Sequence, residues 1–141
     1  MSPKSFPAPE PGDIVWCRFP QLEGIRPGPK ARPALVLSVD DARTPARVRV
    51  AYGTSRRTHE LAPWEFSISP DDVEAFRMAG LSQATKVSML AVVILDYTSL
   101  WFAVAPGLPL RITPKMGVLH PNRVRHAQQA HEEAQRQLRP R

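Results

Sequence analysis

The stretch "PGPKARPALVLSVD", residues 27–40, places a basic loop directly before an apolar run. The run from Pro33 to Val39 is continuous and has the length of a buried strand. Arg32 stands at its threshold, where Pro33 restricts the backbone. We interpret the stretch as a rigid strand start that holds a guanidinium at the rim of a pocket without burying it.

Strands are also expected on either side of this run in the sequence. Residues 13–19 alternate between two partly covered faces, and in residues 46–52 apolar side chains alternate with Arg47 and Arg49. Three successive strands of this kind are expected to form an antiparallel meander. The start of the second strand and the end of the third then meet at one rim of the sheet.

The rest of the chain predicts short strands and two helices. Sixteen prolines, most of them between apolar runs, argue against long helices. Further strands are expected in residues 83–89, 91–97 and 100–104, with a weaker one in residues 110–112. The fold class is therefore mainly β: a small, strongly curved sheet or barrel of six or seven strands with one inserted helix and one C-terminal helix.

Both helices have recognisable ends. The first is expected over residues 69–80, with Ser69 as its cap, Pro70 in its first position and Gly80 at its close. The second is expected over residues 120–138 and packs against the barrel through a narrow apolar stripe. The stripe consists of Val124, Ala127, Ala134 and Leu138.

The length of 141 residues suits one domain with its own core. We expect a flexible proline-rich N-terminus in residues 1–11, the barrel in residues 12–119, and a C-terminal helix with a basic tail in residues 120–141. The longest apolar run, residues 89–95, is far shorter than the roughly 20 residues of a membrane span. A soluble, cytoplasmic protein is expected.

The formal net charge of +6 is distributed unevenly. Residues 18–57 hold nine basic residues against three acids, and residues 111–141 hold seven against two. Between them, residues 58–76 hold five acids and no lysine or arginine. Basic surfaces of this kind bind polyanions such as nucleic acid. The alternative is a solvated arginine-rich surface, and composition alone does not separate the two.

Thiol and metal chemistry find little support in the sequence. Cys17 is the only cysteine, and its place in an apolar strand indicates a small buried residue instead of a nucleophile. His126 and His131 are five residues apart and fall on different sides of a helix. No metal or other cofactor is expected.

What remains is a group of cations and hydroxyls at the expected rim. They are Arg26, Lys30 and Arg32 before the second strand and Thr54, Ser55, Arg56 and Arg57 after the third. A guanidinium and a hydroxyl that contact the same phosphate would neutralise its charge and orient it. RNA carries its own nucleophile, the 2′-hydroxyl, so such a pair suits RNA cleavage without a metal.

Several segments carry a resemblance to a known family. "GDIVWCRFP" (residues 12–20), "RPALVLS" (32–38) and "VRVAYGTS" (48–55) look like the N-terminal half of the MazF/PemK toxin family of type II toxin–antitoxin systems. "AGLSQATKVSMLAVVILDYTSLW" (79–101) is similar to a later pattern of that family. The resemblance implies an SH3-like barrel, usually a homodimer, that cleaves single-stranded RNA and is held inactive by an antitoxin protein.

The resemblance also implies roles for individual residues. Arg32 matches the family's catalytic arginine, and Thr54 matches its catalytic threonine. RNA-binding roles are expected for Arg26, Lys30, Ser55, Arg56 and Arg57.

The acid–base pair departs from the family pattern. Asp96 stands where some members have an acidic general base, but the arginine that precedes this acid by two residues is Ile94 here. Arg56 or Arg57 would supply the missing cation, and Glu23 is the alternative base.

Plainer interpretations stay open for the same residues. Arg32 would cap a strand and pair with Asp13 or Asp40, and Thr54 would be a turn residue. The chain would then be a catalytically degenerate SH3-like barrel that binds RNA or a protein partner without cleavage.

Overall fold

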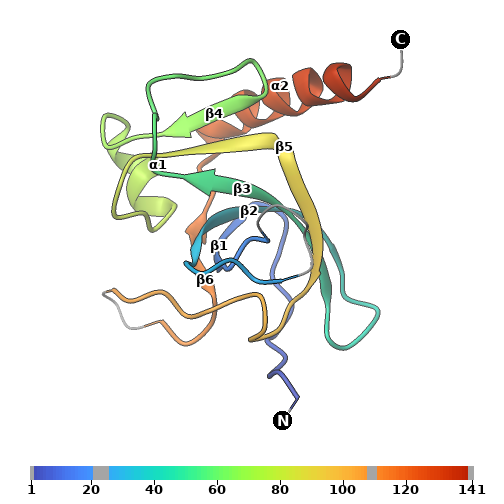
Figure 1. The fold of residues 1–141 in the computed structure, drawn as a ribbon. Helices are drawn as coiled ribbons and strands as arrows, with labels where there is room; N and C mark the ends of the chain where they lie inside the picture. The colour runs from blue at the N-terminus through green and yellow to red at the C-terminus, as the bar shows by residue number, and fades with distance from the viewer. Residues whose placement is uncertain (1, 21–25, 108–110, 140–141) are drawn as a thin grey trace.

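The computed structural model describes residues 2–20, 26–107 and 111–139. Within them, six strands form one antiparallel sheet in the order β4-β5-β3-β2-β1-β6. The elements in chain order are β1 (Asp13–Cys17), β2 (Arg32–Asp40), β3 (Arg47–Thr54), β4 (Glu65–Ile68), α1 (Val73–Met78), β5 (Thr85–Asp96), β6 (Lys115–Val118) and α2 (Pro121–Leu138). The predicted mainly β fold, with one inserted helix and one C-terminal helix, is confirmed (Figure 1).

Strand β5 makes the sheet curl. It has 12 residues and pairs with β3, but its partner position jumps from Val92 to Ser88 between two successive residues of β3. The extra residues bend β5 sharply, as Figure 1 shows. The two strands predicted in residues 83–89 and 91–97 are therefore a single bent strand.

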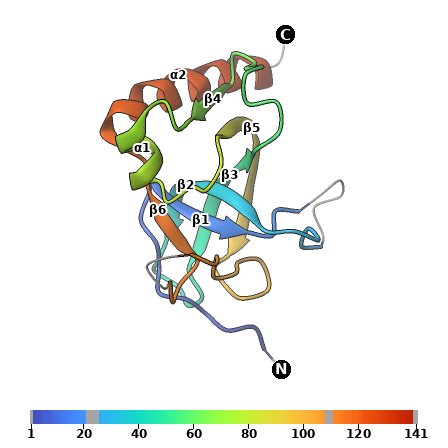
Figure 2. The ribbon, with the colours of Figure 1, turned by 90° about the vertical axis from the view of Figure 1, so that its left-hand side faces the viewer.

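The two faces of the curled sheet bury separate apolar clusters, because successive residues of a strand point to opposite faces. The cluster that includes residues of α2 has as its buried strand residues Ile14, Leu35, Ala51, Phe66, Ile68, Val87 and Met89. The cluster on the other face includes Val15, Cys17, Val36, Val48, Val50 and Leu95. Figure 2 shows both helices gathered at one end of the curled sheet.

Helix α2 begins at Pro121, directly after His120, whose Nδ1 accepts a hydrogen bond from the backbone amide two residues on at 3.0 Å. It packs against β4 and β5, as expected for the C-terminal helix. Its buried residues are Ala127, Ala130 and Ala134. These small side chains let the helix lie close to the sheet, whereas Val124 and Leu138 of the predicted stripe are exposed. Neither described helix is long and apolar enough to cross a membrane.

Helix α1 is shorter than the helix predicted over residues 69–80. It begins at Val73, and the Asp72 carboxylate caps it by accepting a hydrogen bond from the Ala75 amide at 3.2 Å. The predicted cap, Ser69, instead accepts from the amide two residues on at 3.2 Å, which forms a turn before the helix. Asp72 is the better cap because its negative charge also favours the positive end of the helix.

Some strand predictions differ from the structure. Strands β4 and β6 were not predicted, because four residues are too few to show alternation. Residues 100–104 form no strand, and only Phe102 makes an isolated bridge, to Cys17. In the weak prediction at 110–112, residue 110 lies outside the described residues, and the other two are not in a strand.

The N-terminal segment contacts the barrel through Phe6. This side chain is buried, and its ring centroid lies 5.8 Å from that of Tyr97. The Phe6 amide also donates a hydrogen bond to the Tyr97 carbonyl at 3.1 Å. Part of the segment expected to be flexible is therefore held against the domain.

Candidate active site

The start of β2 and the end of β3 lie side by side. Ala34 pairs with Tyr52, and a Cβ on Gly53 would overlap a carbonyl oxygen of β2. Glycine is therefore needed for the two backbones to come this close. Beyond this last ladder pair, continuing the same register by two residues places Arg32 across from Thr54.

Arg32 and Thr54 also share a face of the sheet, because residues that stand opposite each other in an antiparallel pair point to the same side. Arg32 is half-buried and lines a hollow of about 110 Å³ together with Ser55. The other polar residues of this hollow are Ser82, Gln83 and Thr85. The hollow thus brings Arg32 and Ser55 together, whereas Thr54 is not among its lining residues and is placed near Arg32 by the strand register alone.

Arg32 is not engaged by the carboxylates considered as its partners. Asp13 pairs with the Lys115 ammonium at 3.3 Å, and Asp40 accepts a hydrogen bond from a nearby backbone amide at 3.2 Å. Within the described ranges, no ion pair involves Arg32. Its guanidinium can therefore direct several N–H donors to a ligand.

A loop of exposed cations follows Thr54. The Thr54 hydroxyl oxygen accepts a hydrogen bond from the Arg56 amide at 3.2 Å, which turns the chain at the end of the strand. Arg57 turns it further, because its φ of 51° lies in the left-handed region. The residues expected to bind RNA are all exposed on the two segments that adjoin the rim: Arg26, Lys30, Ser55, Arg56 and Arg57.

Asp96 lies at the other end of β3. It pairs in register with Arg47, the first residue of the strand, whereas Thr54 is the last. At about 3.3 Å per residue, the two ends are roughly 23 Å apart. The Asp96 carboxylate forms ion pairs with Arg47 at 3.4 Å and with Arg43 at 3.9 Å. The structure therefore does not bring Asp96 to Arg32 and Thr54 within one chain.

Arg49 lies beside Ile94, the residue that departs from the family pattern, and the sequence did not indicate this. Ile94 is 63% exposed, and Arg49 of β3 stands directly opposite it. An arginine is therefore present one strand away from the position where some family members have one. The alternation in residues 46–52 was the signal, but the partner strand was not predictable. The alternative base, Glu23, lies outside the described residues.

Cys17 lies behind the site, where it pairs with Arg32 across β1 and β2. The side chain is buried, and this burial raises the pKa of its thiol to about 12. A thiol with this pKa stays protonated at neutral pH and is a poor nucleophile. The prediction that Cys17 is a small buried residue is confirmed.

Sequence reasoning also assigned no role to Lys86, which pairs in register with Thr54 across β3 and β5. A lysine inside a strand of largely apolar residues was the available signal.

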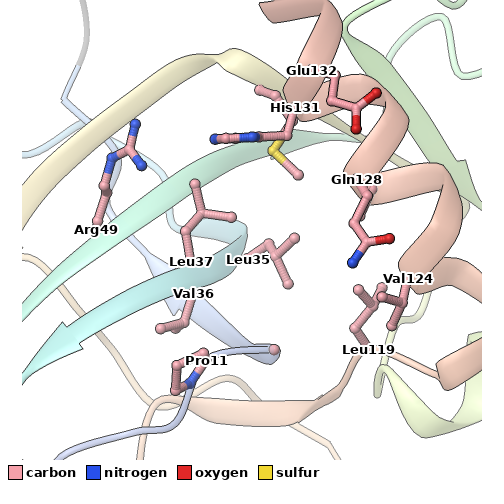
Figure 3. Close-up of a pocket in the computed structure, with 13 residues that line it drawn as sticks. Pro11, Leu35, Val36, Leu37, Arg49, Leu119, Val124, Gln128, His131 and Glu132 are labelled. Atoms are coloured by element: carbon pink, nitrogen blue, oxygen red, sulfur yellow. The ribbon is translucent and has the colours of Figure 1, made fainter. Parts of the chain in front are cut away.

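A larger hollow of about 710 Å³ lies between α2 and the sheet (Figure 3). Leu35 and Leu37 of β2 face Val124 of α2 across it, while Arg49 and Glu132 lie on opposite sides of its rim. None of its lining residues lines the hollow at Arg32. This groove is therefore separate from the candidate active site.

Comparison with known proteins decides the family. Residues 10–99 match the family described as the PemK-like, MazF-like toxins of type II toxin–antitoxin systems. The chain belongs to this family. The match spans β1 to β5, so it includes both Arg32 and Thr54, whereas β6 and α2 lie beyond it.

Solved structures share the fold of this PemK-like toxin. One is an endoribonuclease from a mycobacterial species in complex with its cognate antitoxin, with a TM-score of 0.58, 19% identity, and coverage of 94% of this chain and 100% of that chain. Another is a mycobacterial endoribonuclease with a TM-score of 0.57, 18% identity, and coverage of 96% and 98%. At this identity the likeness establishes the fold. A search among curated proteins finds no match.

Proposed function

We propose that this PemK-like toxin is an endoribonuclease that cleaves single-stranded RNA and uses the RNA's own 2′-hydroxyl as the nucleophile. The observation that carries the proposal is the β2–β3 register, which continued by two residues places Arg32 across from Thr54, next to a hollow lined by Arg32 and Ser55. Family membership and the likeness to two endoribonucleases support it.

The chemistry requires charge stabilisation more than a protein nucleophile. The 2′-oxygen attacks phosphorus as its proton leaves, the bond from phosphorus to the 5′-oxygen breaks, and the 5′-oxygen takes a proton from water, so the products carry a 2′,3′-cyclic phosphate and a 5′-hydroxyl. Arg32 stabilises the negative charge that builds up on the phosphate oxygens, and Thr54 orients one of them. No step needs a metal ion, because the nucleophile is part of the substrate.

A base must accept the proton of the 2′-hydroxyl. Asp96 of the same chain is at the far end of β3, so we propose Glu23, which precedes β2 in the sequence, for this role. Replacing Glu23 with glutamine should lower kcat and remove the acidic limb of the pH–rate profile, while RNA binding persists.

RNA is proposed to approach along the two exposed basic segments that adjoin the rim. The residues are Arg26 and Lys30 before β2 and Ser55, Arg56 and Arg57 after β3. Exposed arginines and lysines attract phosphates whatever the base sequence, so this part of the binding should weaken steeply with salt.

Two protein partners are proposed. One is a cognate antitoxin, because the chain belongs to a toxin–antitoxin family and a similar endoribonuclease was solved with its antitoxin. The other is a second copy of this chain, docked through the groove between α2 and the sheet. Arg49 and Glu132 lie on opposite sides of the groove, so a two-fold mate would pair each arginine with the partner's glutamate.

One observation favours a second candidate function. The described residues that line the hollow at Arg32 include no carboxylate and no histidine, so a general base is not among them. A barrel that binds RNA or a protein partner without cleavage would need none.

Incubation of the purified protein with a mixed-sequence single-stranded RNA in EDTA separates the two functions. Discrete fragments with 2′,3′-cyclic phosphate ends, which disappear in the Arg32→Ala variant, support the nuclease. Salt-sensitive binding that leaves the RNA intact would instead leave the non-cleaving barrel as the function.

A further inference from the structure

Strand β5 passes between the two ends of the loop that follows Thr54. This loop, residues 55–64, leads from the end of β3 to the start of β4. Lys86 of β5 pairs in register with Thr54 on one side and with Ser67 of β4 on the other. Lys86 therefore lies between the strand that the loop leaves and the strand that it enters, where its side chain can contact the loop.

The Lys86 ammonium is bonded to the loop and to the first residue of β4. It donates to the Glu60 carbonyl oxygen at 2.8 Å and to a Glu65 carboxylate oxygen at 3.4 Å. The same Glu65 oxygen accepts a hydrogen bond from the Ala62 amide at 2.8 Å. One lysine and one glutamate thus bind the middle and the end of the loop to β5.

Burial distinguishes Lys86 from the cations that would meet RNA directly. The side chains of Lys86 and Glu65 are only 12% and 15% exposed, whereas those of Arg56 and Arg57 are exposed. A lysine with its charge paired and largely shielded has little attraction left for a phosphate. A buried ion pair also adds little stability over apolar residues of similar size, so fixing a geometry is the better explanation for it.

The loop is in turn coupled to Thr54. The Thr54 hydroxyl oxygen accepts a hydrogen bond from the Arg56 amide, at the start of the same loop. If the loop shifts, this amide shifts with it, and the hydroxyl loses the bond that orients it. A displacement of about 1 Å at a catalytic group lowers rates by about 100-fold.

We propose that Lys86 is a positioning residue: through Glu60 and Glu65 it holds the 55–64 loop so that Thr54 and the loop arginines meet the scissile phosphate together. The inference rests on the proposed nuclease function. Lys86 touches no substrate, so its effect on cleavage runs through Thr54.

The test compares single-turnover cleavage at saturating RNA for wild type, Lys86→Met and Lys86→Arg. Lys86→Met should slow the bound-state rate by about 10- to 100-fold, and Lys86→Arg, which keeps the charge and the donors, should recover most of it. In a Thr54→Val background, Lys86→Met should cause no further loss, because the two residues act as one unit.

Salt dependence provides a second readout. The slope of log affinity against log salt should stay the same in Lys86→Met, whereas loss of a direct phosphate contact in Arg57→Gln should reduce it by about one. A reduced slope in Lys86→Met would mean that Lys86 contacts RNA itself, which contradicts the inference.

Lys115→Met is the matched control. It breaks another lysine–carboxylate pair, with Asp13, at the end of β1 away from Arg32. It should lower stability and leave the cleavage rate unchanged. The double variant Lys86→Met/Glu65→Leu should regain stability without regaining the rate. Recovery of both would reduce Lys86 to a purely structural role and overturn the inference.

The outcomes also separate this inference from the nuclease proposal. If wild type leaves RNA intact, the nuclease proposal fails and the positioning role fails with it. If wild type cleaves and Lys86→Met cleaves equally well, only the positioning role is wrong.

Discussion

The two ends of strand β3 carry similar side chains in different surroundings. At one end, the continued β2–β3 register places Thr54 across from Arg32, which has no ion-pair partner among the described residues. At the other end, Arg47 is paired with Asp96. Both ends offer an arginine beside an oxygen-bearing side chain, which is the combination that the proposed reaction needs.

The difference lies in whether the cation is already neutralised. A carboxylate at 3.4 Å offsets much of the attraction of Arg47 for a phosphate, whereas Arg32 lines a hollow whose described lining holds hydroxyl, amide and apolar side chains and no carboxylate. Residue type alone therefore does not mark the site. The partner across the sheet decides which arginine is available for a ligand.

The largest effect is expected from removing the unpaired cation. Arg32→Ala should lower the cleavage rate by about 100- to 1,000-fold, because one preorganised donor to a developing charge contributes this much. The rate is measured by single-turnover cleavage of a labelled RNA. Arg47→Gln, at the other end of β3, is the control and should cleave like wild type; equal losses in both variants would erase the distinction between the two ends.

The next largest effect is expected from forcing β2 and β3 apart. In Gly53→Ala the new methyl group overlaps the Pro33 carbonyl oxygen, so the strands must separate at the Arg32 end. Unfolding in urea should show a loss of about 1 to 3 kcal/mol, as for other overpacked sites. The cleavage rate should fall with Thr54 unchanged. A variant with wild-type stability and rate would mean that the rim does not depend on this contact.

Burial at the Arg32 end can be tested through Cys17. The folded thiol has its pKa raised from 9.0 to about 12, so the folded state holds this proton more tightly than the unfolded chain does. The stability that the buried, protonated thiol contributes is fully present below about pH 9 and is lost as the pH rises toward 12. Relative to Cys17→Ala, wild type should lose up to about 1.4 kcal/mol of stability per pH unit in that window. Parallel stability curves for the two proteins would show that Cys17 is accessible to solvent.

The smallest effect is expected at the paired end of β3. Asp96→Asn removes two ion pairs whose members are all substantially exposed, so stability should change by less than about 1 kcal/mol in thermal unfolding. Cleavage should match wild type. A tenfold loss of rate would instead mean that Asp96 of one protomer serves the Arg32 site of its partner.

Much of the first half of the fold could be predicted from the sequence. Alternation in residues 13–19 and 46–52, and the apolar run beginning at Pro33, identify β1, β3 and β2. The second half was harder to predict. Strand β5 looks like two strands because its bend depends on its pairing with β3, and Asp72 replaces Ser69 as the cap of α1.

The candidate site, too, could be predicted only in part. The meander predicts that Arg32 and Thr54 share a rim, since two hairpin-connected strands leave few other arrangements. The sequence context of Asp96 makes it a candidate general base, yet the β3–β5 register places it at the opposite end of β3 from Thr54. The roles of Lys86 and Arg49 also depend on this register. It sets Lys86 across from Thr54 and Arg49 across from Ile94.

Residue order within short segments was enough to specify the mainly β class, strands β1 to β3, the C-terminal helix and a basic surface. Alternation, helix-starting prolines and charge can each be recognised within a few neighbouring positions. Which cation is paired, which strand bends, and what holds the loop after Thr54 depended on the folded chain. These features depend on contacts between residues far apart in sequence, and a shift of one position in the β3–β5 pairing would change all of them.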